Sequence, residues 1–427
     1  MADTIANLDP ILKTLFPDDL IRTMGYTNQP LYGMIAKDTT FSGDYSKEPI
    51  LISPSEDRSA NATMALLNVT NVNYQAFLLS RVSNYASAKI ANELIRAASG
   101  DNKGSFLSSL EAVTKSMLFS LLRSIAVQMY RSGTGSVAII SPTAVINNAA
   151  VPVQLLYPSD ITAFEIGQNI AFSATDGSAL LPYTGAGAYV IDVDRVKGTL
   201  VFSATFGGAA AALTSLVTGV AVSDYMYSSP GDAANGGPSV AMSGLDAWLP
   251  VTGVTATPFF GVNRLTDSTR LGGVVYDGTM QQMDEALIDA ANLVAREGGT
   301  PRHCFMNFQD YSNLVKLLGA KQQQIQRTEV KLDEQNVTIG YHGIIIDGAK
   351  GPITVIPDQN CPGGRAYLLQ LDTWKFKSLG EPVSVFTGDG LQIIRDPFAD
   401  YLLMRAVSYY QLSCRAPGWN AVVKLPV

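Results

Sequence analysis

Charged side chains almost disappear from the chain between residues 136 and 243. This stretch of 108 residues holds seven acids and only two cations, Arg195 and Lys197. Gly, Ala, Ser, Thr and Val dominate it, and strand-like runs at 188–193 and 198–202 are separated by turn signals. The pattern predicts a small all-β region, inserted between segments of helical periodicity, that is able to fold alone.

A long amphipathic helix is predicted immediately before this region, over residues 105–131. Its apolar side chains recur every three or four residues, and Gly133 follows its end. At 1.5 Å per residue the helix would be roughly 40 Å long, enough to act as a spine. Residues 84–98 also fit a helix, which would stop at Ser99 and Gly100.

Two extended segments precede these helices. Residues 1–40 are interrupted by proline and glycine, which is typical of an arm that other chains must order. Residues 41–76 contain two alternating apolar runs around a polar tip at 53–61, which predicts a two-stranded excursion. A lone two-stranded ribbon is marginally stable in water, so it should find a partner surface.

The last third of the chain has an α/β pattern. One helix is expected over 278–296 and a second after Asn307, which is a suitable N-terminal cap. Strands are expected to begin near residues 343, 353, 366 and 402.

The overall composition limits the classes of function. Hydrophobic residues make up 47% of the 427 positions and charged residues 16%, against about 25% in typical soluble domains. Such a surface suits a subunit covered by neighbours, or a large α/β enzyme with a generous core. The net charge of −7 argues against a dedicated nucleic-acid binder, and no apolar run reaches the roughly 18 residues of a membrane span. The first residues do not resemble a secretory signal, and the three widely spaced cysteines indicate reduced core residues.

No catalytic, cofactor or metal site is predicted. Residues 133–138 match a GxGxxA pattern, but they follow a helix and precede a strand, the reverse of the dinucleotide-binding order. His303 and His342 lie far apart, and Cys304 would point away from His303 on a strand. Asp192 and Asp194 would share one face of a strand, where turn and surface roles are favoured over cation binding or acid/base work.

The order of these features resembles the Hong Kong 97-type major capsid proteins of tailed phages. Residues 243–250 are similar to a Gly-Leu-x-x-Trp-x-Pro junction in that family, and the segments 260–264, 270–273, 299–314 and 389–417 continue the likeness. The resemblance implies an α+β capsid fold with five parts. These are an N-terminal arm (1–40), an extended loop (41–76), a peripheral lobe with the spine helix (77–135), a β-rich insertion (136–243) and an axial α/β lobe with returning peripheral strands (244–427).

The resemblance also implies a function. The chain would be a structural protein, not an enzyme, that self-assembles as hexamers and pentamers into the icosahedral shell enclosing a phage genome. It would use no cofactor, touch packaged DNA only non-specifically, bind no membrane, and reside in the virion after assembly in the host cytoplasm. A portal, a decoration protein and a separate scaffolding protein are candidate partners. An encapsulin-like cage protein and an α/β enzyme are the alternatives.

The extended loop is the predicted intersubunit contact. Its prolines and charges blunt an exposed edge, while its apolar run would dock on another subunit. We expect charge reversal at Lys47 and Glu48 to lower the subunit's melting temperature by no more than about 1–2 °C. The candidate contact residues are Asp44, Lys47, Glu48, Ile50, Leu51, Ile52 and Arg58.

Overall fold

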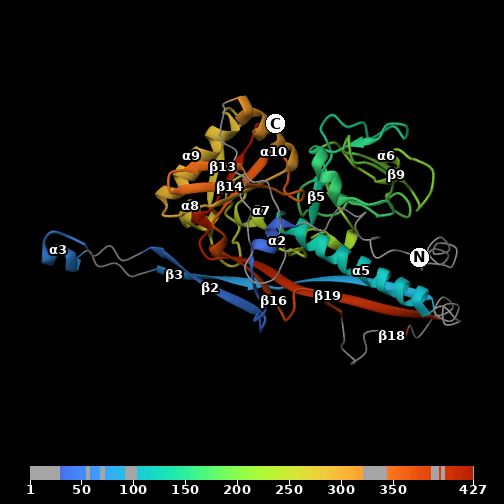
Figure 1. The fold of residues 1–427 in the computed structure, drawn as a ribbon, viewed down its shortest axis with the longest axis horizontal. Helices are drawn as coiled ribbons and strands as arrows, with labels where there is room; N and C mark the ends of the chain where they lie inside the picture. The colour runs from blue at the N-terminus through green and yellow to red at the C-terminus, as the bar shows by residue number, and fades with distance from the viewer. Residues whose placement is uncertain are drawn as a thin grey trace.

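The computed structural model of the protein describes residues 29–53, 58–67, 73–91, 103–320, 344–385, 394–395 and 400–426. A long lower layer of strands carries two lobes on its upper side, and the helix α5 lies along this layer beneath one of the lobes (Figure 1). The small helix α3 lies far from both lobes, at the end of a pair of strands (Figure 1).

The lower layer is a six-stranded sheet organised around the long strand β19. It brings together residues from both halves of the chain, and β4 runs antiparallel to β19 over ten residue pairs from Val82–Tyr410 to Ala91–Tyr401. The strands are β1 (Ala36–Asp38), β4 (Val82–Ala91), β16 (Trp374–Ser378), β17 (Ser384–Val385), β18 (Ile394–Arg395) and β19 (Tyr401–Cys414).

The predicted helix over 84–98 is wrong where the structure describes it, because residues 84–91 belong to β4. Their side chains alternate between half-buried and exposed, with Ala86 and Ala88 turned toward the core and Tyr85 and Ser87 toward solvent. Pairing with β19 overrides the helix propensity of this alanine-containing stretch. Residues 92–98 lie outside the described residues.

The predicted spine helix is confirmed as α5 (Lys103–Gln128). Its 26 residues correspond to about 39 Å. Met117, Leu121 and Ile125 are buried in the core shared with the lower sheet, whereas Val127 is buried in the core of the β-rich region. The helix therefore joins two cores.

The β-rich region contains two three-stranded sheets with a core of their own. Its aromatic residues Phe164, Phe172 and Phe202 are fully buried. The strands are β5 (Ser136–Ile139), β6 (Val153–Gln154), β7 (Ala171–Ser173), β8 (Tyr189–Asp194), β9 (Thr199–Ser203) and β10 (Tyr225–Tyr227), and the short helices are η2 (Pro158–Ala163), α6 (Leu213–Leu216) and η3 (Pro230–Asp232). The region is thus strand-rich, as its composition predicts, but it also includes helical turns.

The other lobe is a mixed six-stranded sheet with two helices on one face. Cys304 and Met306 point to the helices, and Phe305 points into the core shared with the lower layer, as the alternation of a strand requires. The Asn307 side chain accepts a hydrogen bond from Gln309 N at 3.0 Å, which confirms the predicted cap. The elements are β11 (Val274–Asp277), α9 (Met283–Arg296), β12 (His303–Met306), α10 (Phe308–Ala320), β13 (Ile344–Gly348), β14 (Gly351–Pro357), β15 (Arg365–Leu369) and β20 (Ala421–Lys424).

Short helical turns complete the body. In α2, Leu31 is buried, and Ile35 follows it into the same core, so the segment just before residue 40 packs inside the subunit. These turns are α2 (Pro30–Met34), α7 (Leu245–Trp248), η4 (Arg264–Asp267), α8 (Ser268–Gly272), η5 (Leu371–Thr373) and η6 (Pro417–Trp419). Residues 1–28 of the predicted arm lie outside the described residues.

The three cysteines are buried and free, as predicted from their spacing. Among the described residues, no helix has the length and apolar character needed to cross a membrane.

Candidate intersubunit contact site

The predicted two-stranded excursion is present and projects from the body (Figure 1). Strand β2 (Tyr45–Ser53) pairs antiparallel with β3 (Asn73–Ser80), and we call these two strands the ribbon. Residues 58–67, which include α3 (Ala62–Leu67), form the ribbon tip. The contact residues predicted from the sequence all lie in or beside these two segments.

The inner face of the ribbon is buried against its own subunit. Ile50 and Ile52 are 8% and 7% exposed and belong to the main hydrophobic core. Glu48 is 4% exposed and forms an ion pair with Lys377, while Arg415 Nε lies 3.4 Å from its Oε2. The assignment of Glu48, Ile50 and Ile52 to an intersubunit contact is therefore wrong, because strand alternation turns these residues inward. Because Glu48 is buried in this ion pair, we now expect reversal of its charge to lower the melting temperature of the subunit by more than the roughly 1–2 °C expected from the sequence.

The outer face of the ribbon carries apolar side chains that the described subunit leaves uncovered. Tyr45, Leu51, Tyr74 and Leu78 are 60%, 52%, 68% and 39% exposed. Lys47 lies on the same face and is exposed, as is Asp44 just before the ribbon. This face remains a candidate contact surface.

The ribbon tip has no interior of its own. No residue of α3 is buried, and Met64, Leu66 and Leu67 are 54%, 77% and 74% exposed. A helix of six residues is too short to be stable in water without a packing surface. Arg58 is also exposed and makes no ion pair or hydrogen bond with the described residues.

An aromatic cluster fixes the ribbon at its base. Trp248 in α7 is fully buried, with its ring centroid 5.0 Å from Phe77 on β3 and 5.0 Å from Phe259. The backbone N–H of Leu78 donates to the carbonyl of Phe260 at 2.9 Å. The tryptophan of the 243–250 motif thus anchors the ribbon to the body.

A buried arginine closes this cluster. Arg264 donates to the carbonyls of Ala247 and Trp248 at 2.8 and 3.2 Å, and its guanidinium lies over the Phe259 ring, 4.1 Å from the centroid. Burial lowers the pKa of Arg264 to about 10. The carbonyls and the ring compensate for the loss of water around the charge.

Two largely buried ion pairs join separate parts of the body. Arg131, just after α5, lies 3.1 Å from Asp160 of the β-rich region. Arg365 on β15 pairs with Asp246 in α7 at 2.6 Å, and Tyr367 donates to the same carboxylate. Burial raises the pKa of Asp160. Removing either partner of such a pair would leave a desolvated charge, so the pairs fix how these parts fit together.

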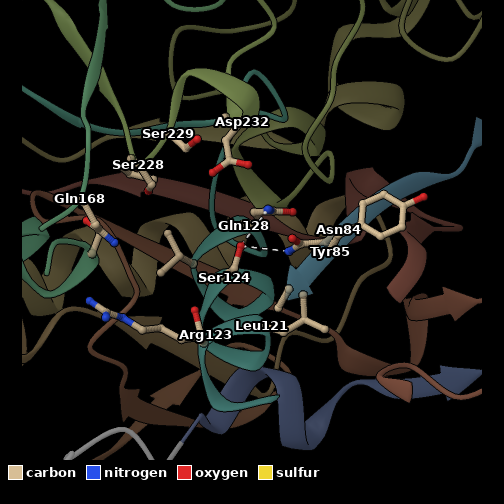
Figure 2. Close-up of a pocket in the computed structure, with 16 residues that line it drawn as sticks. Asn84, Tyr85, Leu121, Arg123, Ser124, Gln128, Gln168, Ser228, Ser229 and Asp232 are labelled. Atoms are coloured by element: carbon tan, nitrogen blue, oxygen red, sulfur yellow. Dashed lines mark hydrogen bonds between the residues drawn. The ribbon is translucent and has the colours of Figure 1, made fainter. Parts of the chain in front are cut away.

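A polar cleft lies between α5, the end of β4 and the β-rich region (Figure 2). Its volume is about 350 Å³. Its walls carry serine hydroxyls and side-chain amides together with Arg123 and Asp232. Sequence reasoning missed the cleft, because its residues are scattered from Asn84 to Asp232 and match no motif.

The sequence patterns considered for chemistry have structural roles in the described residues. Residues 133–138 form the turn from α5 into β5, as predicted. Gly135 has φ +94°, and a Cβ there would collide with the carbonyl of Asp232, so glycine is required by close backbone approach. Asp194 accepts from the backbone N–H groups of Val196 and Lys197 at 3.0 Å each, which is a turn role.

The described histidine, His303, does not form a reactive pair with its neighbour Cys304. Cys304 is fully buried beneath the helices, and the half-buried His303 points to the other face of β12, as strand alternation predicts. Burial raises the pKa of Cys304, which keeps its thiol protonated and unreactive. Across the described ranges, no group of three His, Cys, Asp or Glu side chains could hold a metal ion. His342 lies outside those ranges.

The chain is similar to phage capsid proteins, both in part of its sequence and in its fold. Residues 222–391 match the family model of the SU10 major capsid protein. The chain is also similar to a chain of the cyanophage A-1(L) capsid asymmetric unit, with a TM-score of 0.53, 13% identity, and coverage of 93% of this chain and 92% of that one. The chain therefore has the fold of a phage capsid chain, and the part that matches a family model matches that of a major capsid protein. The α+β capsid fold expected from the resemblance is confirmed, and the cage-protein and enzyme alternatives are not favoured.

Weaker likenesses accompany these matches. A chain from the capsid of a native GTA particle has a TM-score of 0.44 and 10% identity over 97% of this chain and 100% of that chain. A chain from Mycobacterium phage Adephagia has a TM-score of 0.41 and 9% identity over 100% and 99%. No curated protein matches the sequence.

Proposed function

We propose that this capsid protein assembles as hexamers and pentamers into an icosahedral shell that encloses a phage genome, with each ribbon lying over a neighbouring subunit. The observation that carries the proposal is the ribbon tip, whose helix α3 buries none of its residues in its own subunit. Exposed apolar surface of this kind is typical of a surface that another protein covers.

The ribbon is suited to this contact because its two ends differ. Its base is held by the Glu48–Lys377 ion pair and the Trp248 cluster, so the strands leave the body in a fixed direction. Its outer face and tip offer Asp44, Lys47, Leu51 and Arg58 as contact residues. Each contact is small, but every subunit gives one and receives one, so a closed shell gains stability by multivalency.

We assign the parts of the chain to places in this shell. Residues 77–135, with the returning strands β16 and β19, form the peripheral lobe, and the remainder of 244–427 gathers around the five-fold and six-fold axes. Residues 136–243 form an insertion, and residues 41–76 form the extended loop. We limit the arm to the residues before Pro30, since Leu31 and Ile35 are buried in the body.

The protein acts through contacts and not through catalysis. Its partners in assembly would be further copies of itself, a portal, and, where they are used, a scaffolding protein and a decoration protein. The net charge of −7 suits non-specific and weak contact with packaged DNA. Assembly would take place in the host cytoplasm, and the mature location is the virion.

The double variant Leu66→Ser/Leu67→Ser tests the proposal. Both side chains contact little in their own subunit, so the melting temperature of the unassembled protein should stay unchanged, while the yield of shells should fall to less than about a tenth. Sedimentation velocity and negative-stain microscopy measure the yield. Val196→Ser, at a position 92% exposed on the β-rich region, is the control and should assemble normally. Normal shell yield from the double variant would exclude the ribbon tip as a contact.

A further inference from the structure

We propose that the polar cleft beside the spine helix is a receptor for a basic side chain of a second copy of this chain, and that Arg58 in the ribbon tip is the group it takes. The inference rests on the proposed function, since it names the surface on which a neighbour's ribbon docks.

The carboxylate of Asp232 dominates the cleft. Figure 2 shows it on the opposite side of the cleft from Ser124 on α5, pointing toward Gln128. Asp232 accepts no hydrogen bond from a described residue, although Ser228 and Ser229 line the same wall. Asp232 is exposed to solvent, and its partial burial by the cleft walls raises its pKa. A cation placed against it would offset that loss of solvation.

One amide oxygen of the cleft wall has no described partner. Asn84 donates from its amide nitrogen to Ser124 Oγ at 3.0 Å and to the Tyr410 hydroxyl at 3.2 Å, which leaves its Oδ1 without a described partner. Gln128 Nε2 also donates to Ser124 Oγ, at 3.2 Å. An unused acceptor in the same cleft as a carboxylate suits a ligand with several N–H donors.

The cation already present at the cleft does not neutralise Asp232. Arg123 donates to Glu165 Oε1 at 2.7 Å and to the carbonyl of Thr162. Arg123 is thus committed to the β-rich wall. Asp232 is thus left without a paired cation among the described residues of its own subunit.

A guanidinium fits this arrangement better than a metal ion. Divalent metals take several carboxylate or carbonyl oxygens close together, and Asp232 belongs to no such cluster in the described ranges. The guanidinium presents five N–H donors in a planar fork, which can reach separate acceptors such as Asp232 and Asn84 at once.

Arg58 is the complementary group, because it is exposed, has no partner among the described residues of its own subunit, and precedes the apolar helix α3. The rim of the cleft offers an apolar surface to that helix. Ile166 and Phe206 are 62% and 57% exposed, and the Phe206 ring lies against Gly167, next to Gln168 in the cleft wall. Arg58 can therefore enter the cleft while Leu66 and its neighbours pack on Ile166 and Phe206.

Charge exchange tests the pairing. Asp232→Arg and Arg58→Asp, made singly in the full chain, should each raise the protein concentration needed for half-maximal shell formation about tenfold. The double variant should bring this concentration most of the way back to the wild-type value. Asp232→Asn should weaken assembly in the same direction with less risk to folding. Asp192→Arg, at an exposed acid elsewhere on the β-rich region, is the matched control and should behave as wild type. Melting temperatures of the unassembled variants show whether each subunit is folded.

A cross-link tests the contact directly. The three native cysteines are buried, so Arg58→Cys with Asp232→Cys places the reactive thiols at the proposed contact alone. A short bis-maleimide should then produce a ladder of covalent multimers from assembled protein, and neither single cysteine variant should. Failure of wild-type protein to form shells under any condition would overturn the proposed function. If wild-type protein forms shells and every charge variant assembles equally well, or if the double cysteine variant gives no ladder, this inference is overturned and the proposed function stands.

Discussion

Glu48 is the residue on which the attachment of the ribbon depends. It lies on a two-stranded element that projects from the body, yet it is buried and shares its carboxylate between Lys377 and Arg415. Lys377 also donates to Ser46 Oγ at 2.8 Å, so its ammonium is held by two groups of the same strand. The pair joins β2 to β16 across 329 residues of sequence.

Glu48→Ala should lower the free energy of unfolding by about 3–5 kcal/mol, because it leaves the buried ammonium of Lys377 without a counter-charge. Urea denaturation of the unassembled subunit measures the loss. Lys47→Ala, the exposed neighbour, is the control and should change stability by less than about 0.5 kcal/mol. Equal stability of the two variants would mean that the Glu48 pair contributes nothing to the subunit.

At the scale of helices and strands, some elements could be predicted from the sequence and others could not. The spine helix and the ribbon were predicted because their apolar residues keep one period over many positions. Strand β4 was misread as a helix, since its pairing partner β19 lies about 320 residues further on and leaves no local trace. The inner and outer faces of the ribbon could not be told apart, because Glu48 and Leu51 reverse the usual rule for polar and apolar residues.

The candidate site was less predictable than the fold. Arg58 and Leu51 were named from the sequence because exposed charge beside apolar residues suggests a contact. Asp232 gave no signal, since a single acid in a glycine-rich loop is ordinary in sequence. Its significance depends on the cleft walls, which come from segments more than 100 residues apart.

The sequence predicts that residues 136–243 fold alone, but α5 contributes to the core of this region, so we now expect the spine helix and the β-rich region to behave as one stability unit. Val127 of α5 is 6% exposed in the core of that region, so Val127→Ala should cost about 1.5–3 kcal/mol of unfolding free energy. Val196→Ala, at an exposed turn of the same region, should cost less than about 0.5 kcal/mol. Thermal or urea denaturation of the unassembled subunit compares them. Identical losses would indicate that the region is independent of the helix.

At the scale of the whole molecule, the described residues form three large hydrophobic cores and one small one, and α5 and the ion pairs of Asp160 and Asp246 tie the elements around them together. The main core takes in one face of the upper sheet, the lower sheet and the ribbon base. The subunit therefore has a firm body, and the described surface that lacks internal support is the ribbon tip.

Two deletions test where the body begins. Removal of residues 1–28 leaves every described contact in place, so the subunit should unfold cooperatively at its original temperature while losing assembly. Removal of residues 1–36 also takes Leu31 and Ile35 from the core and should cost about 3–6 kcal/mol. Differential scanning calorimetry distinguishes the two. Loss of the cooperative transition in the shorter deletion would mean that the first 28 residues belong to the body.

The position of β19 in the chain has a consequence for protein synthesis. The partner strand β4 emerges from the ribosome early, but β19 and β20 complete the lower and upper sheets only when residues 401–424 have been made. At about 5–20 residues per second, roughly 20–60 s pass between the two events. A nascent chain thus exposes its own ribbon before it has the folded surface to which another chain's ribbon would bind. We therefore expect contact between unfinished chains on one polysome to be weak, and assembly to begin from released, completed subunits.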